Sequence, residues 1–183
     1  MNRYSDFIDR MLLHGDLLQK LQPVEPFDRD LLREVRTLDN ATLSGGKEIR
    51  NETMFPLVRG GVLYALDALD ECHSLFQDVH NDTGSYWHGM MHRREGDFDN
   101  ARYWFRRAGV LPVFSALHRA ASEYCADMAR QTNWDPYLVT GQGEQARHGA
   151  PELAPVLIKL QRVEFDILFD FCWRESVSTK PPN

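Results

Sequence analysis

Long apolar runs are absent from this chain of 183 residues. No stretch approaches the roughly 18–20 apolar residues that a membrane-spanning helix requires. The first ten residues carry too much charge for a signal peptide. We therefore expect a cytoplasmic protein that does not bind a membrane. The length is most simply that of one domain with a core of its own.

Cysteine is scarce as well. The three cysteines, Cys72, Cys125 and Cys172, form no CxxC pair and show no paired spacing. Each lies on an apolar helical stripe. This pattern predicts reduced, buried thiols in a cytosolic protein.

An excess of positive charge is also missing, because the net charge is −6, and this argues against nucleic-acid binding. Residues 84–109 are an exception, since they hold five arginines and three carboxylates. A positive region on an acidic chain favours a small anionic molecule or an acidic protein segment as partner. The alternative is that these arginines pair with carboxylates of the chain itself.

Helical periodicity of apolar residues dominates the chain, and no segment alternates convincingly as a strand. The predicted fold is all-α: a compact bundle of about six or seven helices. The expected helices cover residues 4–22, 27–38, 59–79, 85–95, 98–108, 114–131 and 152–176. They form one domain over residues 1–176, with N-terminal helices in 4–38, a long loop in 39–56, central helices in 59–109 and a disordered tail in 177–183. Residues 133–136 predict a turn in which Asp135 is the N-cap and Pro136 the N1 residue of little more than one helical turn. Residues 141–151 are predicted as a loop.

The two helices within residues 84–109 are joined by a tight turn. Gly96 ends the first helix, Asp97 is a favourable N-cap for the second, and Gly109 suits the position beyond its end. The apolar face of the second helix repeats with helical spacing and consists of Ala101, Trp104, Phe105 and Ala108. Its opposite side carries Arg102, Arg106 and Arg107.

Two histidines on the first of these helices are four residues apart. His88, His92 and Glu95 share one side of the helix, and residues so spaced have Cβ atoms about 5–6 Å apart. Two such imidazoles can share a divalent transition metal, with Glu95 or His73 as a further ligand. His73 comes near them if the preceding helix lies antiparallel. The alternatives are a solvated polar face, or histidines hydrogen-bonded across a helix interface.

Two further charged residues occupy apolar helical faces. Glu164 lies in the middle of the apolar stripe of the C-terminal helix, and Arg94 projects into the arc that contains Trp87. A buried charge needs a partner, so we expect Glu164 to pair with Arg94 or His73. The candidate ligand site combines both features and comprises His73, Trp87, His88, His92, Arg94, Glu95, Tyr103, Trp104 and Glu164.

The central hairpin resembles one tetratricopeptide unit. Gly89, Gly96, Ala101, Phe105 and Ala108 match the small and aromatic consensus positions of that repeat. No second copy follows at a 34-residue period, so the resemblance does not imply a repeat array. The longer string from Tyr86 to Arg107 is similar to a helical family known from uncharacterised proteins of bacteria and fungi. This second resemblance covers roughly residues 60–176 and implies no particular activity.

Three hypotheses follow from these patterns. The favoured one is an inter-helix pocket that binds a small anionic molecule, with catalysis left open because no activated nucleophile is evident. The second is a tetratricopeptide-like module that binds an acidic segment through its arginines. The third is a metal-dependent enzyme that uses His88 and His92. The apolar C-terminal helix is also compatible with a homodimer.

Overall fold

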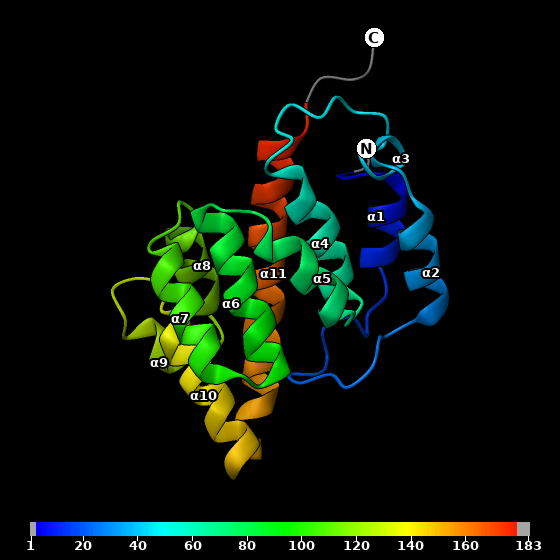
Figure 1. Ribbon diagram of the computed structural model, residues 1–183. Helices are drawn as coiled ribbons and strands as arrows, with labels where there is room; N and C mark the ends of the chain where they lie inside the picture. The colour runs from blue at the N-terminus through cyan, green and yellow to red at the C-terminus, as the bar shows by residue number, and fades with distance from the viewer. Residues whose placement is uncertain (1–2, 179–183) are drawn as a thin grey trace.

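The computed structural model describes residues 3–178, and within them every regular element is helical, which confirms the all-α fold class (Figure 1). The α-helices are α1 Asp6–Leu12, α2 Arg29–Thr37, α3 Asn40–Leu43, α4 Phe55–Ala65, α5 Leu69–Gln77, α6 Asp82–Glu95, α7 Phe98–Ala108, α8 Phe114–Ala121, α9 Ala126–Ala129, α10 Pro136–His148 and α11 Ala154–Ser176. A short 3-10 turn, Pro151–Leu153, precedes α11.

The longest helix, α11, forms the centre of the bundle. It packs against α4, α8 and α10, and Figure 1 shows it passing behind α4 and α6. Its buried apolar residues are Leu157, Leu160, Phe165, Leu168, Phe169, Cys172 and Trp173. The N-terminal helices α1–α3 lie on one side of this centre, and α6–α9 lie on the other.

Helix α6 is enclosed between its sequence neighbours. Every residue from 83 to 94 is buried, because α5 packs on one side, α7 on the other, and α4 also contacts it. Asn81 caps its start, since the Asn81 side chain accepts a hydrogen bond from the Gly84 amide at 2.7 Å. The helix ends at Gly96, whose φ of 81° is the left-handed conformation that favours glycine. Asp97 then caps α7, as the sequence predicts.

The predicted helix over residues 59–79 is interrupted. Helix α4 ends at Ala65 and α5 begins at Leu69, with Asp67 between them at a φ of 60°. The physical reason is Arg94 of α6, which donates to the Tyr64 carbonyl at 2.9 Å and to the Asp67 carboxylate at 2.5 Å. The fully buried Arg94 guanidinium therefore provides a hydrogen-bond donor for a backbone carbonyl at the end of α4, where the helix offers too few donors.

Other predicted boundaries also change. The helix expected over residues 114–131 is divided into α8 and α9, and the helix expected over residues 4–22 is α-helical only in α1. The region predicted as a loop over 141–151 is largely part of α10, which starts from the predicted cap at Asp135. Its interior glycines lower helix propensity, and this concealed the helix. The expected loop over 39–56 contains α3.

The prediction of a disordered tail is wrong for Val177 and Ser178. Val177 is buried and forms an isolated antiparallel bridge with Ile49, and the Ser178 amide donates to the Glu48 carbonyl at 2.8 Å. The predicted loop supplies these backbone partners, which the local sequence does not reveal. Residues 179–183 lie outside the described residues. Among the described helices, none combines the length and apolar character needed to cross a bilayer.

The contact between α6 and α7 depends on Gly89. A Cβ added at Gly89 would lie 2.7 Å from Cε1 of Phe105, whose ring is itself buried. We expect Gly89→Ala to lower the free energy of unfolding by about 1–2 kcal/mol, because overpacking exceeds the gain in helix propensity. Urea denaturation measures this change. The control is Gly141→Ala in α10, where the added Cβ has no atom within 4 Å, and it should leave stability equal or higher.

Candidate metal site

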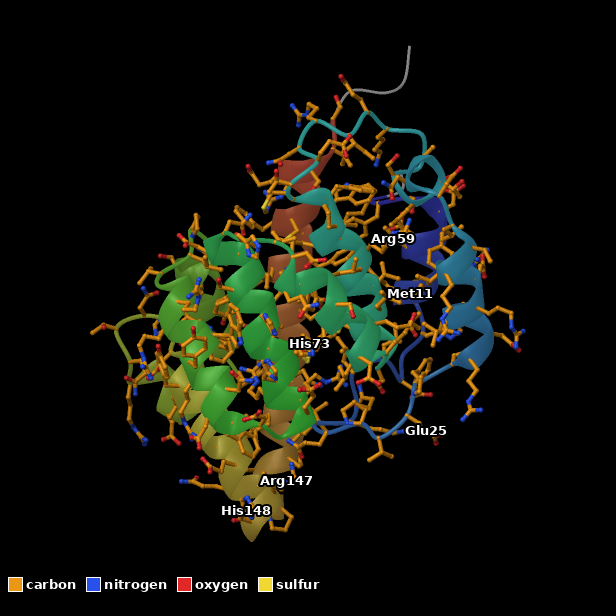
Figure 2. The ribbon with its side chains drawn as sticks, viewed as in Figure 1. Met11, Glu25, Arg59, His73, Arg147 and His148 are labelled. Atoms are coloured by element: carbon orange, nitrogen blue, oxygen red, sulfur yellow. The ribbon has the colours of Figure 1, made fainter. Side chains whose placement is uncertain are left out.

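Three histidines from two adjacent helices form one cluster. His73 comes from α5, and His88 and His92 lie one turn apart on α6 (Figure 2 labels His73, beside the ribbon of α6). Their ring centroids are 4.6 Å apart for His73 and His88, 5.0 Å for His73 and His92, and 4.7 Å for His88 and His92. The short turn between α5 and α6 makes the helices neighbours, which brings His73 to the pair as predicted.

The ring nitrogens of this cluster are close to the spacing of metal ligands. One nitrogen from each ring lies within 4.8 Å of the others. Nitrogens around a tetrahedral ion with bonds of about 2.1 Å are roughly 3.4 Å apart. Side-chain rotations that move the ring nitrogens by about an ångström would therefore bring the three imidazoles to the spacing needed to share one ion.

His88 is the most unusual member of the cluster. Its side chain is 3% exposed, and neither ring nitrogen has a hydrogen-bond partner within the described part of the chain. Trp104 of α7 stacks on the ring at 3.9 Å between centroids. Burial, followed by the neighbouring His92 and His73, lowers the pKa of His88 to about 3. The ring is thus neutral, and it presents a lone pair that no described group uses.

His92 is held by two polar neighbours. Its Nδ1 lies 2.9 Å from Oε2 of Glu95, and its Nε2 lies 3.1 Å from Nδ2 of Asn100. A carboxylate only accepts hydrogen bonds, so Nδ1 carries the proton and Nε2 carries the lone pair. Burial lowers the pKa of His92, although Glu95 opposes this shift. A carboxylate on the far nitrogen is the arrangement that commonly orients metal-ligating histidines.

Glu164 does not belong to this cluster. Its fully buried carboxylate pairs with Arg93 and accepts a hydrogen bond from the Tyr86 hydroxyl at 2.6 Å. The Trp134 indole donates to the same hydroxyl at 2.5 Å. The expected pairing with Arg94 or His73 is therefore wrong. Arg93 faces α11 and its neighbour Arg94 faces α4, because successive residues on a helix point about 100° apart.

The aromatic residues of the predicted pocket are dispersed. Trp87 is part of the core, where it stacks on Phe76 at 5.3 Å and donates to the Cys172 thiol at 3.2 Å. Tyr103 is 46% exposed and contacts the edge of Trp104. Of the three predicted aromatic residues, only Trp104 contacts a histidine of the cluster.

The positive charges in and around the hairpin are largely neutralised within the chain. Arg93 and Arg94 form buried pairs, and Arg102 pairs with Glu144 of α10 and with Asp99. The alternative that these arginines bind the chain's own carboxylates is thus confirmed for these three. Arg107 instead lies over the ring of Trp104, at 5.4 Å from its centroid.

A cleft of about 490 Å³ opens beside Glu95. Its charged lining residues are Glu25, Arg36, Asp67, Asp70, Glu71 and Glu95. Arg36 is bound by both carboxylate oxygens of Glu71, at 2.6 and 3.0 Å. A lining dominated by carboxylates disfavours an anionic ligand here.

The cysteines are free and buried, as predicted. Burial raises the pKa of the Cys72 thiol, and this thiol donates to the Leu69 carbonyl at 3.2 Å. Burial also raises the pKa of Cys172 to about 12. Neither Cys72 nor Cys172 is an activated nucleophile.

Asn100 is the site residue that sequence reasoning missed. It lies four residues before Trp104 on α7, so both side chains face the histidines of α6. This i,i+4 relation to Trp104 is the signal that would have found it.

No family model, curated protein or solved structure matches the chain. The functional argument therefore starts from the geometry of the cluster.

The buried pair of Arg93 and Glu164 gives a stability prediction. We expect Glu164→Gln to lower the free energy of unfolding by about 3–5 kcal/mol, because it leaves the Arg93 charge buried without a counter-charge. Chemical denaturation measures the loss. The control is Asp166→Asn, which breaks the pair of Arg162 and Asp166 on the partly exposed side of α11 and should cost at most about 1 kcal/mol. Equal effects would contradict the prediction.

The depressed pKa of His88 predicts acid sensitivity of the metal-free protein. In the unfolded chain His88 takes up a proton near the ordinary histidine pKa of about 6.5. In the folded chain its pKa is about 3, so it stays neutral down to that pH. Stability is therefore complete above 6.5 and falls as the pH drops through this window. We expect His88 to contribute a loss of about 1–2 kcal/mol between pH 7 and pH 5. In denaturation at both pH values, His88→Phe should reduce the loss, whereas His148→Ala should not.

Proposed function

We propose that the protein binds a divalent transition-metal ion through His73, His88 and His92 and is a metal-dependent enzyme. The observation that carries this proposal is His88, a buried imidazole with two unpartnered nitrogens beside two other imidazoles. A buried polar group without a partner costs about 1–3 kcal/mol. An ion shared by the three rings offsets that cost for the His88 nitrogen that carries the lone pair, while the N–H on the other nitrogen keeps no partner among the described residues.

The chemistry of the ligands favours a transition metal. Imidazole nitrogens suit zinc, copper, nickel and iron, whereas magnesium and calcium prefer oxygen ligands. His92 supports the proposal because Glu95 holds it in the tautomer that directs the Nε2 lone pair away from the carboxylate. Glu95 is then an orienting residue and not a ligand.

The number of ligands favours catalysis over a structural role. Structural zinc sites have four protein ligands, whereas catalytic sites have three and keep one position open. An ion in such a site acts as a Lewis acid and activates a bound water for hydrolysis or hydration. Three free cysteines agree with a reducing, cytoplasmic location for this chemistry.

The proposal differs from a pocket for small anions lined by all nine predicted residues. Glu164, Arg94 and Trp87 are engaged elsewhere in the fold, and the cleft beside Glu95 is acidic. An ion at the cluster would itself be the positive group that attracts an anion.

Metal titration of the chelator-treated protein tests the proposal. We expect one cobalt or zinc ion per chain, with a rise in the unfolding free energy of about 2.7 kcal/mol when free metal is 100 times the dissociation constant. His88→Phe is the decisive variant, because it keeps a ring stacked on Trp104 but removes both nitrogens. It should remain folded and bind the ion at least about 100-fold more weakly.

The matched control is His148→Ala, which removes an exposed histidine at the end of α10 (Figure 2). This variant should bind metal like the wild type. The proposal is contradicted if the wild type binds no stoichiometric ion, or if His88→Phe binds it equally well. Circular dichroism of each metal-free variant checks that the helices persist.

A further inference from the structure

The histidine cluster offers three protein ligands, and the neighbouring donors are already engaged. Within residues 3–178, the group of side chains close enough to share one ion is His73, His88 and His92. Glu95 is bound to His92 through Oε2, and the Cys72 thiol donates to a backbone carbonyl. Asp97 accepts the Asn100 backbone amide as the cap of α7. A tetrahedral ion at the cluster would thus take its fourth ligand from solvent.

Asn100 approaches the cluster from α7. Its backbone is fixed by the Asp97 cap at 3.1 Å, and its Nδ2 lies 3.1 Å from Nε2 of His92. The direction of the amide follows from the chain of hydrogen bonds: Glu95 requires a proton on Nδ1, so Nε2 is an acceptor. An oxygen at this place would set two lone pairs against each other. Asn100 therefore presents its N–H group to the site.

An ion that binds Nε2 of His92 uses the lone pair that now accepts from Asn100. The amide donor then lies next to the ion but cannot coordinate it, because an N–H group has no lone pair to offer. The Asn100 N–H then needs another acceptor in place of Nε2 of His92. The non-protein atom that completes the coordination of the ion would be that acceptor. A donor in this position favours an oxygen or nitrogen atom that carries negative charge.

The surroundings of Asn100 agree with a position open to small ligands. Asn100 and Trp104 are partly exposed, and so is His73, whereas His88 and His92 are buried beneath them. Trp104 covers the face of His88 and limits the space above the rings. The accessible part of the cluster is consequently its outer edge, toward α5 and α7.

We infer that the ion keeps one exchangeable position for a small anion, hydroxide included, and that Asn100 binds this ligand through its side-chain N–H. The inference rests on the proposed metal site and adds to it the class of ligand and the residue that selects it. Asn100 touches the exchangeable ligand and does not hold the ion.

Azide binding to the cobalt-loaded protein tests the inference, with visible absorption as the readout. We expect the wild type to bind azide. Asn100→Ala should bind azide with about tenfold lower affinity, because the loss of one hydrogen bond to an anion weakens binding by about that factor. The cobalt content should be unchanged. Asn100→Asp should weaken azide binding further, because a carboxylate repels the anion, and Asn100→Ser should restore part of the affinity through its hydroxyl donor.

The control for general electrostatics is Arg106→Gln, which removes an exposed positive charge from the same helix. It should change azide affinity less than about twofold, since exposed charges are screened. Equal azide affinity in Asn100→Ala and wild type overturns the inference, as does a cobalt-loaded wild type that binds no azide. Loss of cobalt in Asn100→Ala would make Asn100 a ligand and would also overturn it. Failure of the wild type to bind cobalt refutes the metal site itself, and the inference with it.

Discussion

The enclosure of α6 is the constraint on which the structure depends. This helix carries two histidines and two arginines into the interior, because α5, α7 and α4 cover it. Each buried polar group then needs a partner, since an unpaired one is costly. The partners come from different elements: Glu164 of α11 for Arg93, and Asp67 between α4 and α5 for Arg94. The two arginines thereby connect α6 to α11 and to the junction between α4 and α5.

The two arginine pairs and the histidine cluster differ in one physical respect. Both guanidinium groups are bound to carboxylates, and Arg94 also donates to the Lys20 carbonyl at 3.0 Å. The cluster contains an imidazole that has no partner among the described residues. Architectural polar groups are normally satisfied in the folded protein, whereas binding sites keep groups that only a ligand satisfies. Of the Arg93 and Arg94 guanidinium atoms, Nε of Arg94 lacks a partner within residues 3–178, whereas His88 lacks one there at both of its ring nitrogens, and this difference sets the proposed site apart from the polar groups that hold the fold.

Much of the fold was predictable from local patterns. The caps at Asp97 and Gly96 defined the hairpin, and the apolar stripe defined α11, because these signals lie within a few residues of the structure they specify. The break between α4 and α5 was not predictable. Its cause is Arg94, which is 27 residues from Asp67 along the chain and reaches it only after α6 has packed. Ile49 and Val177 pair across most of the chain for a similar reason.

For the site, the sequence by itself determined that His88 and His92 share one side of a helix, because their spacing matches the helical repeat. It also placed His73 near them, through the short turn that makes α5 and α6 neighbours. Only the tertiary structure decided that Glu164 binds Arg93, that Trp87 enters the core and that Asn100 joins the cluster. Helical periodicity gives the direction of a side chain, but the group that it meets depends on how distant helices pack.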